Sequence, residues 1–446
     1  MAEFTRVDFQ TSGKKDMRAM AKRLVVVDGV RTPFARIGTD LAGVDADELG
    51  RIAVNALLAR TAIDPGMIDE VIMGCVGQPM GAVNVARVIA LRAGIPKHVP
   101  AMTVSRNCAS GCEALTQAQE KMVAGRGSIF VVGGVESMTR YPLIFRQSTA
   151  VKFATFSKAK TLGQKLYAMS CFRPADFTPQ SALLLGLTDP VSGLNMGETA
   201  ELITREHGIT RQMQDEFALD SHQRTLAAHD RLADEICPVY ISPDFKRVMV
   251  EDNGPRPDQS LEALAKLKPV FDHNMGTVTA GNSSQLTDGG VALLVMSEAK
   301  AAELGYTPLG ALTGYSYTGC DPARMGLGPL SAMAQAETQT GLTIQDADIV
   351  EINEAFAGQV LAVLKLAESK TYARDVLDRS TAIGEIPRAI LNVNGGAVAL
   401  GHPVGATGAR LILSSLKELH RRKAKRALVS LCVGGGQGAA LWLERL

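Results

Sequence analysis

Apolar residues along the chain fall into two patterns: short continuous runs typical of buried strands, and longer stretches with helical spacing. A β-branched run at residues 24–27 ends at Asp28-Gly29 and predicts a strand. Helical spacing within residues 47–58 predicts a helix after it. A longer helical stretch with a polar face is expected at residues 201–229. This alternation of strands and helices predicts an α/β fold.

The pattern of the first half of the chain recurs in the second half. Residues 63–75 place an acidic loop before a short apolar strand, and residues 342–354 repeat that arrangement. The glycine-led apolar run at residues 289–296 matches residues 435–443 in the same way. We therefore expect a duplicated α/β unit, whose mixed sheets are covered by helices on both faces.

The repeat also includes a helix and the strand that follows it. Cys108 precedes a predicted helix that leads to a strand at residues 129–133. His402 precedes a helix at residues 406–419 that leads to a strand at residues 427–431. Both halves are therefore expected to have the same order of elements.

The strand at residues 289–296 completes the first half only after a long interruption. Residues 140–286 are therefore expected to form an inserted domain. The expected organisation is a polar tail (1–22), a first half (23–139 and 287–308), the insertion (140–286) and a second half (309–446).

Composition limits the classes of protein to which the chain can belong. Hydrophobic residues make up 46% and charged residues 21% of the 446 positions, which is typical of a globular protein. The net charge of +1 gives no basis for nucleic-acid binding, which needs a basic face. The seven cysteines form no C-x-x-C pair, so we expect free thiols rather than a metal site or a disulfide framework.

The N-terminal region gives no sign of a targeting signal. Residues 1–22 are polar and mixed in charge, without the apolar centre of a secretory signal. No apolar run in the chain approaches the ~20 residues of a membrane span. We therefore expect a cytoplasmic protein.

Residues 104–115 contain the first candidate for catalysis. Cys108 follows an apolar run and precedes a helical pattern, so its thiol is expected at a helix N-terminus. The helix dipole and free N–H groups at that position favour a thiolate. Ser110 and Gly111 leave room for a substrate carbonyl. The alternative is a buried structural cysteine.

Two glycine-rich blocks near the C-terminus supply partners for such a thiol. His402 lies between Gly401 and Pro403, and a histidine elsewhere in the chain can act as the base for a cysteine nucleophile. Cys432 lies on a predicted strand before several glycines and can act as a second acid–base group. Each residue alone also fits a structural role. His402 fits a core histidine and Cys432 a core cysteine on an apolar strand. Asn353, which lies between residues 108 and 402 in the chain, fits the end of a strand.

Several motifs together resemble those of the thiolases, the enzymes that make or cleave 3-ketoacyl-CoA. The similarity extends from about Arg23 to the C-terminus and implies a five-layered αβαβα fold of two similar halves with a loop domain. It also implies CoA as a substrate, no further cofactor, and a homodimer or homotetramer. The motifs are Asn-Cys-Ala-Ser-Gly at Cys108, Gly-Gly-Val-Glu-Ser-Met (133–138), Thr-Ala-Gly-Asn-Ser-Ser (279–284), Asn-Glu-Ala-Phe at Asn353 and both glycine-rich blocks.

The resemblance implies a role for each residue of these motifs. Cys108 would be the acylated nucleophile and His402 the base that takes its proton. Cys432 would exchange a proton with the α-carbon of acetyl-CoA. Asn353, through a water and together with His402, would form one oxyanion hole, and the N–H groups of Cys108 and Gly434 would form the other.

Contacts with CoA and the acyl group are implied by the same resemblance. Asn195 replaces a histidine of many biosynthetic thiolases, and Asn353 replaces a histidine of many oxidation-complex subunits. Arg256 has a second interpretation, a solvated loop charge. The implied contacts are Ala280 and Ser284 with the pantetheine, Arg256 with the nucleotide end, and Met196, Met325 and Phe356 along the reacting pocket.

Residues 146–177 mix basic and aromatic residues and resemble the extra loop of thiolase subunits in fatty-acid oxidation complexes. A basic amphipathic helix there would dock on a membrane surface or on a hydratase–dehydrogenase partner. The alternative is a solvated helix that caps the substrate tunnel.

The sequence therefore predicts a thiolase that cleaves medium or long 3-ketoacyl-CoA in β-oxidation, and an acetoacetyl-CoA-specific acetyl-CoA acetyltransferase is the second candidate. A decarboxylating ketoacyl synthase would not place Cys432 before Gly-Gly-Gly. A non-catalytic acyl-CoA or lipid-binding relative would have lost Cys108 or His402, and this chain has both.

Overall fold

The computed structural model describes residues 23–241 and 243–446, so the predicted tail lies outside the described residues. Its largest sheet runs in the order β12-β13-β14-β11-β1-β10-β5-β3-β4. The path divides into two halves, which meet at only two residue pairs between β1 and β11, Val25–Ala311 and Val26–Gly310. No helix in the described part of the chain is long and apolar enough to cross a membrane.

In the first half, β10 pairs antiparallel with β1 and β5, while β5, β3 and β4 run parallel. The first strand is longer than predicted, because it continues through Asp28 and Gly29 after a register shift. The bounds are β1 (Leu24–Arg31), β3 (Glu70–Gly74), β4 (Ala101–Val104), β5 (Ile129–Ser137) and β10 (Thr287–Ser297), with β2 (Ala35–Arg36) beside β10.

The second half repeats this order. Its antiparallel strand β14 lies between β11 and β13, and β13 runs parallel to β12. Where the first half has β4, the second has a single parallel bridge between Val350 and Leu391. The predicted duplication is confirmed. The bounds are β11 (Gly310–Gly319), β12 (Ile349–Ile352), β13 (Arg426–Val433) and β14 (Gln437–Glu444).

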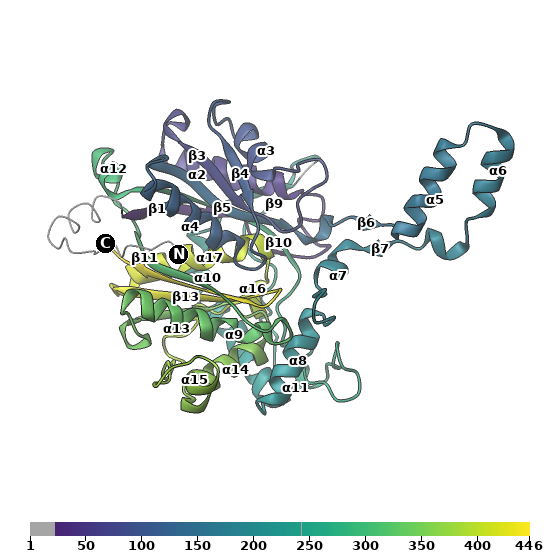
Figure 1. Cartoon of the computed structure of the whole chain (residues 1–446). Helices are drawn as coiled ribbons and strands as arrows, with labels where there is room; N and C mark the ends of the chain where they lie inside the picture. Colours follow the sequence, from purple (N-terminus) through teal and green to yellow (C-terminus); the bar gives the residue numbers. More distant parts are fainter. Residues whose placement is uncertain (1–22, 242) are drawn as a thin grey trace, which may run out of the picture.

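Helices complete five layers (Figure 1). Two helices cover the outer face of the first half-sheet, two lie between the half-sheets, and two cover the outer face of the second. A Cβ on Gly111 would meet the backbone of Ala409, and one on Gly408 would meet that of Cys112, so the two middle helices touch through their backbones. In this order the pairs are α2 (Ala46–Thr61) with α3 (Val85–Arg92), α4 (Ser110–Val123) with α17 (Val404–Arg422), and α13 (Gly328–Thr340) with α14 (Ala357–Ala367).

Between Ser137 and Thr287 the chain leaves the large sheet. The helical stretch predicted at residues 201–229 is present but divided, because Gly208 adopts φ 62° and ends the first helix. The elements nearest the body are α7 (Ala182–Gly186), α8 (Met196–Glu206), α9 (Arg211–Ala227), α10 (His229–Ala233), β8 (Val239–Ile241), β9 (Arg247–Met249) and α11 (Leu261–Ala265).

An arm formed by residues 143–181 projects from the body (Figure 1). Its stalk is the two-stranded pair β6 (Leu143–Ile144) and β7 (Gln180–Ser181), and its tip holds α5 (Gln147–Lys158) and α6 (Leu162–Ser170). Phe145, Phe153, Phe172 and Phe177 pack against one another within it, and the rings of Phe172 and Phe177 are stacked. The expected single amphipathic helix is therefore two helices, and the alternative of a cap over the substrate tunnel is wrong, because the arm points away from the body.

Candidate active site

Cys108 lies in the turn between β4 and α4. Hydrogen bonds from a side chain stabilise this turn. Asn107 adopts a left-handed backbone conformation (φ 43°), which asparagine tolerates better than most residues. Ser110 Oγ donates to the carbonyl of Asn107 (2.7 Å) and accepts the N–H of Arg106 (2.9 Å). The sequence thus places the thiol immediately before the first turn of α4.

The backbone N–H groups of Gly434 and of Cys108 itself lower the pKa of the Cys108 thiol, so both act on its sulfur. The loop that contains Gly434 is held by Asn107, whose Nδ2 donates to the Gly434 carbonyl at 2.8 Å. These are the two N–H groups that the sequence analysis expected in an oxyanion hole. Gly434 and Cys108 lie in opposite halves of the fold, and their N–H groups act on the same sulfur.

Burial raises the pKa of the Cys108 thiol, and the N–H groups of Gly434 and Cys108 lower it only in part. The carboxylate of Glu136 raises it further. The expectation that the helix N-terminus favours a thiolate is therefore wrong, because desolvation outweighs the N–H groups. A thiol that stays protonated needs a base before it can attack a carbonyl.

His402 has the protonation state of such a base. Its Nδ1 lies 2.6 Å from Thr407 Oγ1, and the Thr407 hydroxyl donates its own proton to the Pro403 carbonyl (3.0 Å). Thr407 can therefore only accept from the ring, so Nδ1 carries the proton and Nε2 keeps its lone pair. Burial, with a smaller contribution from Arg410, lowers the pKa of His402 to about 3, so the ring is neutral near pH 7.

Asn353 lies beside the unprotonated nitrogen. Its Nδ2 is 3.4 Å from His402 Nε2, and its Oδ1 is buried without a partner in the described part of the chain. The N–H of Asn353 donates to the carbonyl of Ser430 (2.9 Å), which continues the pairing of β12 with β13. The amide and the imidazole therefore lie together where the sequence analysis expected an oxyanion hole.

Cys432 lies in β13 opposite Gly438, and its thiol is buried. Burial raises its pKa well above the usual value, and the charges of Cys108 and Cys320 add to that effect. Asn107, next to Cys108, bonds the carbonyl of Gly434, two residues after Cys432, so the segments that hold the two thiols are in contact. A protonated thiol in this position is suited to deliver a proton to a carbanion.

Three residues expected along the reacting pocket gather around Cys432. Met196, Met325 and Phe356 pack with it in one apolar cluster. Met196 begins α8, which Asn195 caps: its Oδ1 accepts the N–H of Glu198 at 3.0 Å. Asparagine at position 195 therefore has a structural role as a helix cap.

The remaining expected contacts lie on loops. The N–H of Ser284 donates to the Ala355 carbonyl (2.9 Å), which ties its loop to that of Asn353. Ala280 on the same loop is exposed. Arg256 is also exposed, and its backbone N–H donates to His222 Nδ1 (3.2 Å).

Residues 24–299 match the sequence model of the thiolase N-terminal domain, and residues 306–445 match that of the thiolase C-terminal domain. The chain belongs to the thiolase family. A 3-ketoacyl-CoA thiolase of Pectobacterium atrosepticum is 42% identical to it over 95% of this chain and 96% of that protein. A 3-ketoacyl-CoA thiolase of Yersinia pestis is likewise 42% identical, over 95% and 97%.

Solved structures of thiolases agree with the fold. Human mitochondrial 3-ketoacyl-CoA thiolase in complex with CoA superposes with a TM-score of 0.81 at 36% identity, covering 96% of this chain and 99% of that chain. The acetyl-CoA acetyltransferase of Bacillus anthracis gives a TM-score of 0.83 at 37% identity, with coverage of 96% and 99%. The predicted thiolase fold is therefore confirmed.

Sequence reasoning missed three residues of this thiolase site: Asn107, Thr407 and Glu136. The first two fix the Gly434 loop and the His402 tautomer, and Glu136 is a buried carboxylate near Cys108. Asn107 lies beside the cysteine in the motif, so its position was the only available signal. Nothing in the sequence indicated which hydroxyl would bond the imidazole.

Replacing Thr407 by valine is expected to lower kcat for thiolysis by about 10- to 100-fold. The shape is kept, but Nδ1–H loses its acceptor, so the ring no longer holds Nε2 unprotonated. We would measure the pH profile of kcat for the wild type, Thr407→Val and Thr407→Ser. The serine variant keeps the hydroxyl and should recover most of the rate, and equal rates in all three would contradict this role.

Proposed function

We propose that this thiolase cleaves 3-ketoacyl-CoA with CoA to acetyl-CoA and a shortened acyl-CoA in fatty-acid β-oxidation. It is an acyltransferase, and CoA is its substrate rather than a bound cofactor. The observations that best support this function are the buried thiol of Cys108, which packs in one cluster with Val404, and the neutral His402, which lies two residues before Val404 and pairs with Asn353. Nucleophile, base and oxyanion donors are what acyl transfer needs.

The first half of the reaction breaks a carbon–carbon bond. His402 Nε2 takes the proton of Cys108, and the sulfur attacks the 3-keto carbonyl, whose oxyanion accepts the N–H groups of Cys108 and Gly434. Cleavage leaves the acyl group on Cys108 and an acetyl-CoA enolate facing Asn353 and His402. Cys432 then protonates the enolate carbon, which gives acetyl-CoA.

The second half restores the enzyme. The thiol of CoA attacks the acyl-cysteine while its proton passes to the Cys432 thiolate. His402 returns its proton to the departing Cys108 sulfur. Each oxyanion donor is expected to contribute ~3 kcal/mol, because a fixed donor in a buried site needs no reorganisation as charge develops.

Medium and long chains are the proposed substrates, and acetoacetyl-CoA alone is the second candidate, as the similarity to an acetyl-CoA acetyltransferase suggests. Steady-state thiolysis of acetoacetyl-CoA and of a C8 to C16 ketoacyl-CoA series separates them. A kcat/KM that rises with chain length supports the β-oxidation role. Activity confined to acetoacetyl-CoA would replace it with the acetyltransferase role.

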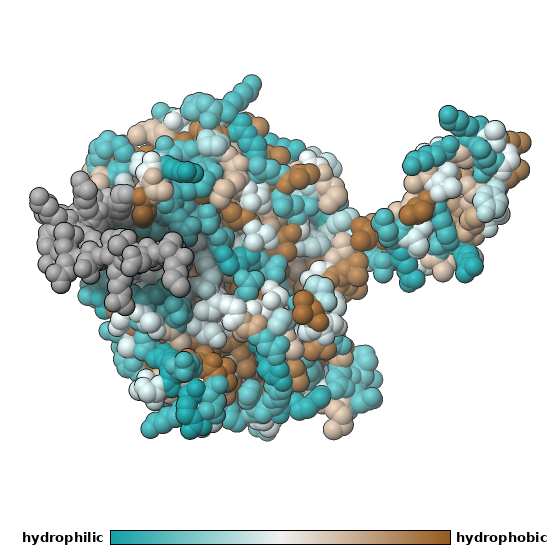
Figure 2. All heavy atoms as spheres, viewed as in Figure 1, coloured by the Kyte–Doolittle hydropathy of each residue, from teal (hydrophilic) through white to brown (hydrophobic). Residues whose placement is uncertain are grey.

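The arm at residues 143–181 is proposed to dock on an anionic membrane surface. Its helices and the turn between them expose Lys158, Lys160 and Lys165, and α6 exposes Leu166 and Tyr167. Figure 2 shows hydrophobic side chains on the arm, well away from the body. Exposed cations beside apolar side chains favour the interface of an anionic bilayer. Docking on a hydratase–dehydrogenase subunit is the second candidate, because the stacked phenylalanines make the arm a preformed surface.

Exchanging Lys158, Lys160 and Lys165 for glutamate is expected to abolish co-sedimentation with vesicles of anionic phosphatidylglycerol. Each lysine contributes about 1 kcal/mol at such a surface, so reversing three removes a large part of the affinity. Lys97→Glu, an exposed lysine outside the arm, is the matched control. Binding to neutral vesicles that survives the exchange would contradict an electrostatic dock, and binding to the partner subunit alone would favour the second candidate.

A homodimer or homotetramer in the cytoplasm is the proposed assembly. It is supported by β4, an edge strand of the sheet whose residues are all half-buried, because such an edge can pair with another chain. The sedimentation coefficient of the purified chain measures the assembly directly.

A further inference from the structure

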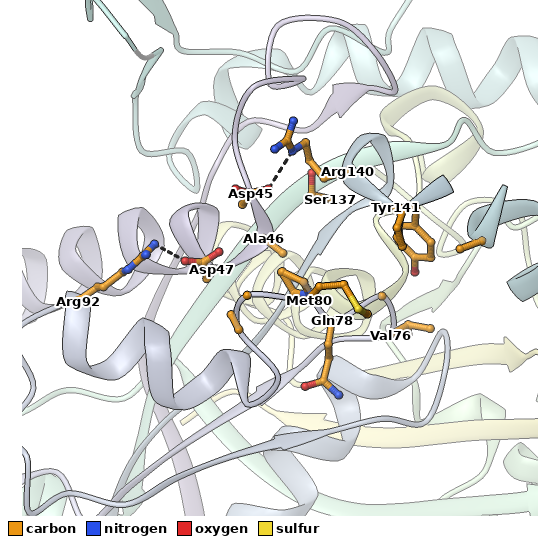
Figure 3. Close-up of a pocket in the computed structure, with 16 residues that line it drawn as sticks. Asp45, Ala46, Asp47, Val76, Gln78, Met80, Arg92, Ser137, Arg140 and Tyr141 are labelled. Atoms are coloured by element: carbon orange, nitrogen blue, oxygen red, sulfur yellow. Dashed lines mark hydrogen bonds and ion pairs between the residues drawn. The ribbon is translucent and has the colours of Figure 1, made fainter. Parts of the chain in front are cut away.

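A cavity of about 720 Å³ opens between α2, the loop after β3 and the base of the arm (Figure 3). Its volume lies within the range of small-molecule sites. One end is apolar and includes Val76, Met80 and Ala182. At the other end Arg140 Nε pairs with Asp45 Oδ1 at 2.8 Å, and Arg92 pairs with Asp47.

The catalytic thiol has an apolar neighbourhood of its own. Cys108 packs in one cluster with Val76 and Tyr141, and with Leu183 and Leu187 from the segment that follows the arm. Val76 and Tyr141 also line the cavity. Pro142 and Ala182, which line it as well, are the neighbours of Tyr141 and Leu183 in the chain. The thiol cluster and the cavity are therefore contiguous and share two side chains.

Tyr141 is fixed at this junction. Its ring covers Gly77 so closely that a Cβ there would overlap it. Its hydroxyl lies 3.1 Å from Glu136 Oε1, and the same carboxylate accepts the N–H groups of Gly77 (2.8 Å) and Gly405 (2.8 Å). A ring held at both its face and its hydroxyl forms a fixed side wall where the thiol cluster meets the cavity.

We propose that the acyl chain carried on Cys108 runs past Val76 and Tyr141 into this cavity, and that Tyr141 sets which chain lengths enter. This inference rests on the proposed thiolase function and names the subsite that gives it chain-length specificity. Apolar walls near the thiol suit methylene groups, whereas the two ion pairs at the far end mark where an apolar chain stops gaining contacts.

The first test fills the cavity away from the thiol. Ala182→Trp is expected to lower the ratio of kcat/KM for the C12 substrate to that for acetoacetyl-CoA at least about tenfold, because an indole takes the place of several methylenes. Leu184→Trp adds the same ring to an exposed position of α7 that does not line the cavity, and its ratio should equal that of the wild type. Tyr141→Ala removes the wall and should move the optimum to longer chains.

A binding measurement separates this inference from the proposed reaction. In the Cys108→Ala background, calorimetry with dodecanoyl-CoA and acetyl-CoA gives the affinity gained from the chain without any turnover. Loss of that gain in Cys108→Ala/Ala182→Trp, with acetyl-CoA still bound, supports the subsite even if no ketoacyl-CoA is cleaved. If Ala182→Trp changed neither the affinity gained from the dodecanoyl chain nor the kcat/KM ratio, the acyl subsite would be rejected while the thiolysis reaction would stand. A chain-length optimum that is unchanged in Tyr141→Ala would also reject the subsite.

Discussion

Replacing Cys108 by alanine is expected to lower kcat for thiolysis by about 10⁴-fold or more, because the proposed acyl-enzyme forms on the Cys108 sulfur. Fold and substrate binding should be kept, since alanine fills the same turn before α4. Rapid quenching followed by mass spectrometry should find an acyl group on the tryptic peptide of Cys108 in the wild type and none in the variant.

Cys171 supplies the control for that experiment. It is an exposed thiol on the arm, far along the chain from the catalytic elements. Cys171→Ala should leave kcat and the acylated peptide unchanged. Full thiolysis by Cys108→Ala would reject the covalent mechanism as a whole.

Replacing Cys432 by serine is expected to lower kcat for thiolysis by about 10³-fold. The hydroxyl is a far weaker acid than the thiol, so the enolate formed by carbon–carbon cleavage is protonated more slowly. Transfer of an acetyl group between acetyl-CoA and labelled CoA through Cys108 breaks no carbon–carbon bond. In that exchange Cys432 handles only the proton of the CoA thiol, which can also enter as a thiolate. Exchange should therefore fall far less than thiolysis in Cys432→Ser, and it should be lost in Cys108→Ala.

The two assays together assign the two thiols. Exchange is followed by the isotope in acetyl-CoA, and thiolysis by the loss of the ketoacyl-CoA absorbance. If Cys432→Ser lost both activities equally, Cys432 would act on the acyl-enzyme itself or on the fold, and its role as the carbon acid–base would be rejected.

Much of the architecture followed from hydrophobic pattern. The match of residues 63–75 with 342–354, and of 289–296 with 435–443, predicted strands that occupy equivalent places in the two half-sheets. Periodicity succeeds here because the repeated strands are buried on both faces and therefore read as continuous apolar runs. It did not predict that β1 continues through Asp28-Gly29, because the bulge that allows this depends on the partner strand β10.

The candidate site was predicted less completely. Motif resemblance indicated Cys108, His402 and Cys432, but the direction of the thiol pKa depends on burial, which the sequence does not encode locally. Likewise, the tautomer of His402 depends on a hydroxyl one helical turn along α17. The sequence predicts one helix for the arm, because its aromatic residues suit both a helix face and a small core of their own.

The duplicated halves have a consequence for how such a site could arise. Cys108 lies two residues before α4 and His402 two residues before α17, so nucleophile and base occupy equivalent places in the two repeats. A single ancestral half would have exposed the apolar inner face of its middle helix and would have associated with a copy of itself. Its two sites would then have been identical. Two halves in one chain can differ at equivalent turns, so that one turn can hold the proposed nucleophile and the other the proposed base, which two identical subunits could not do.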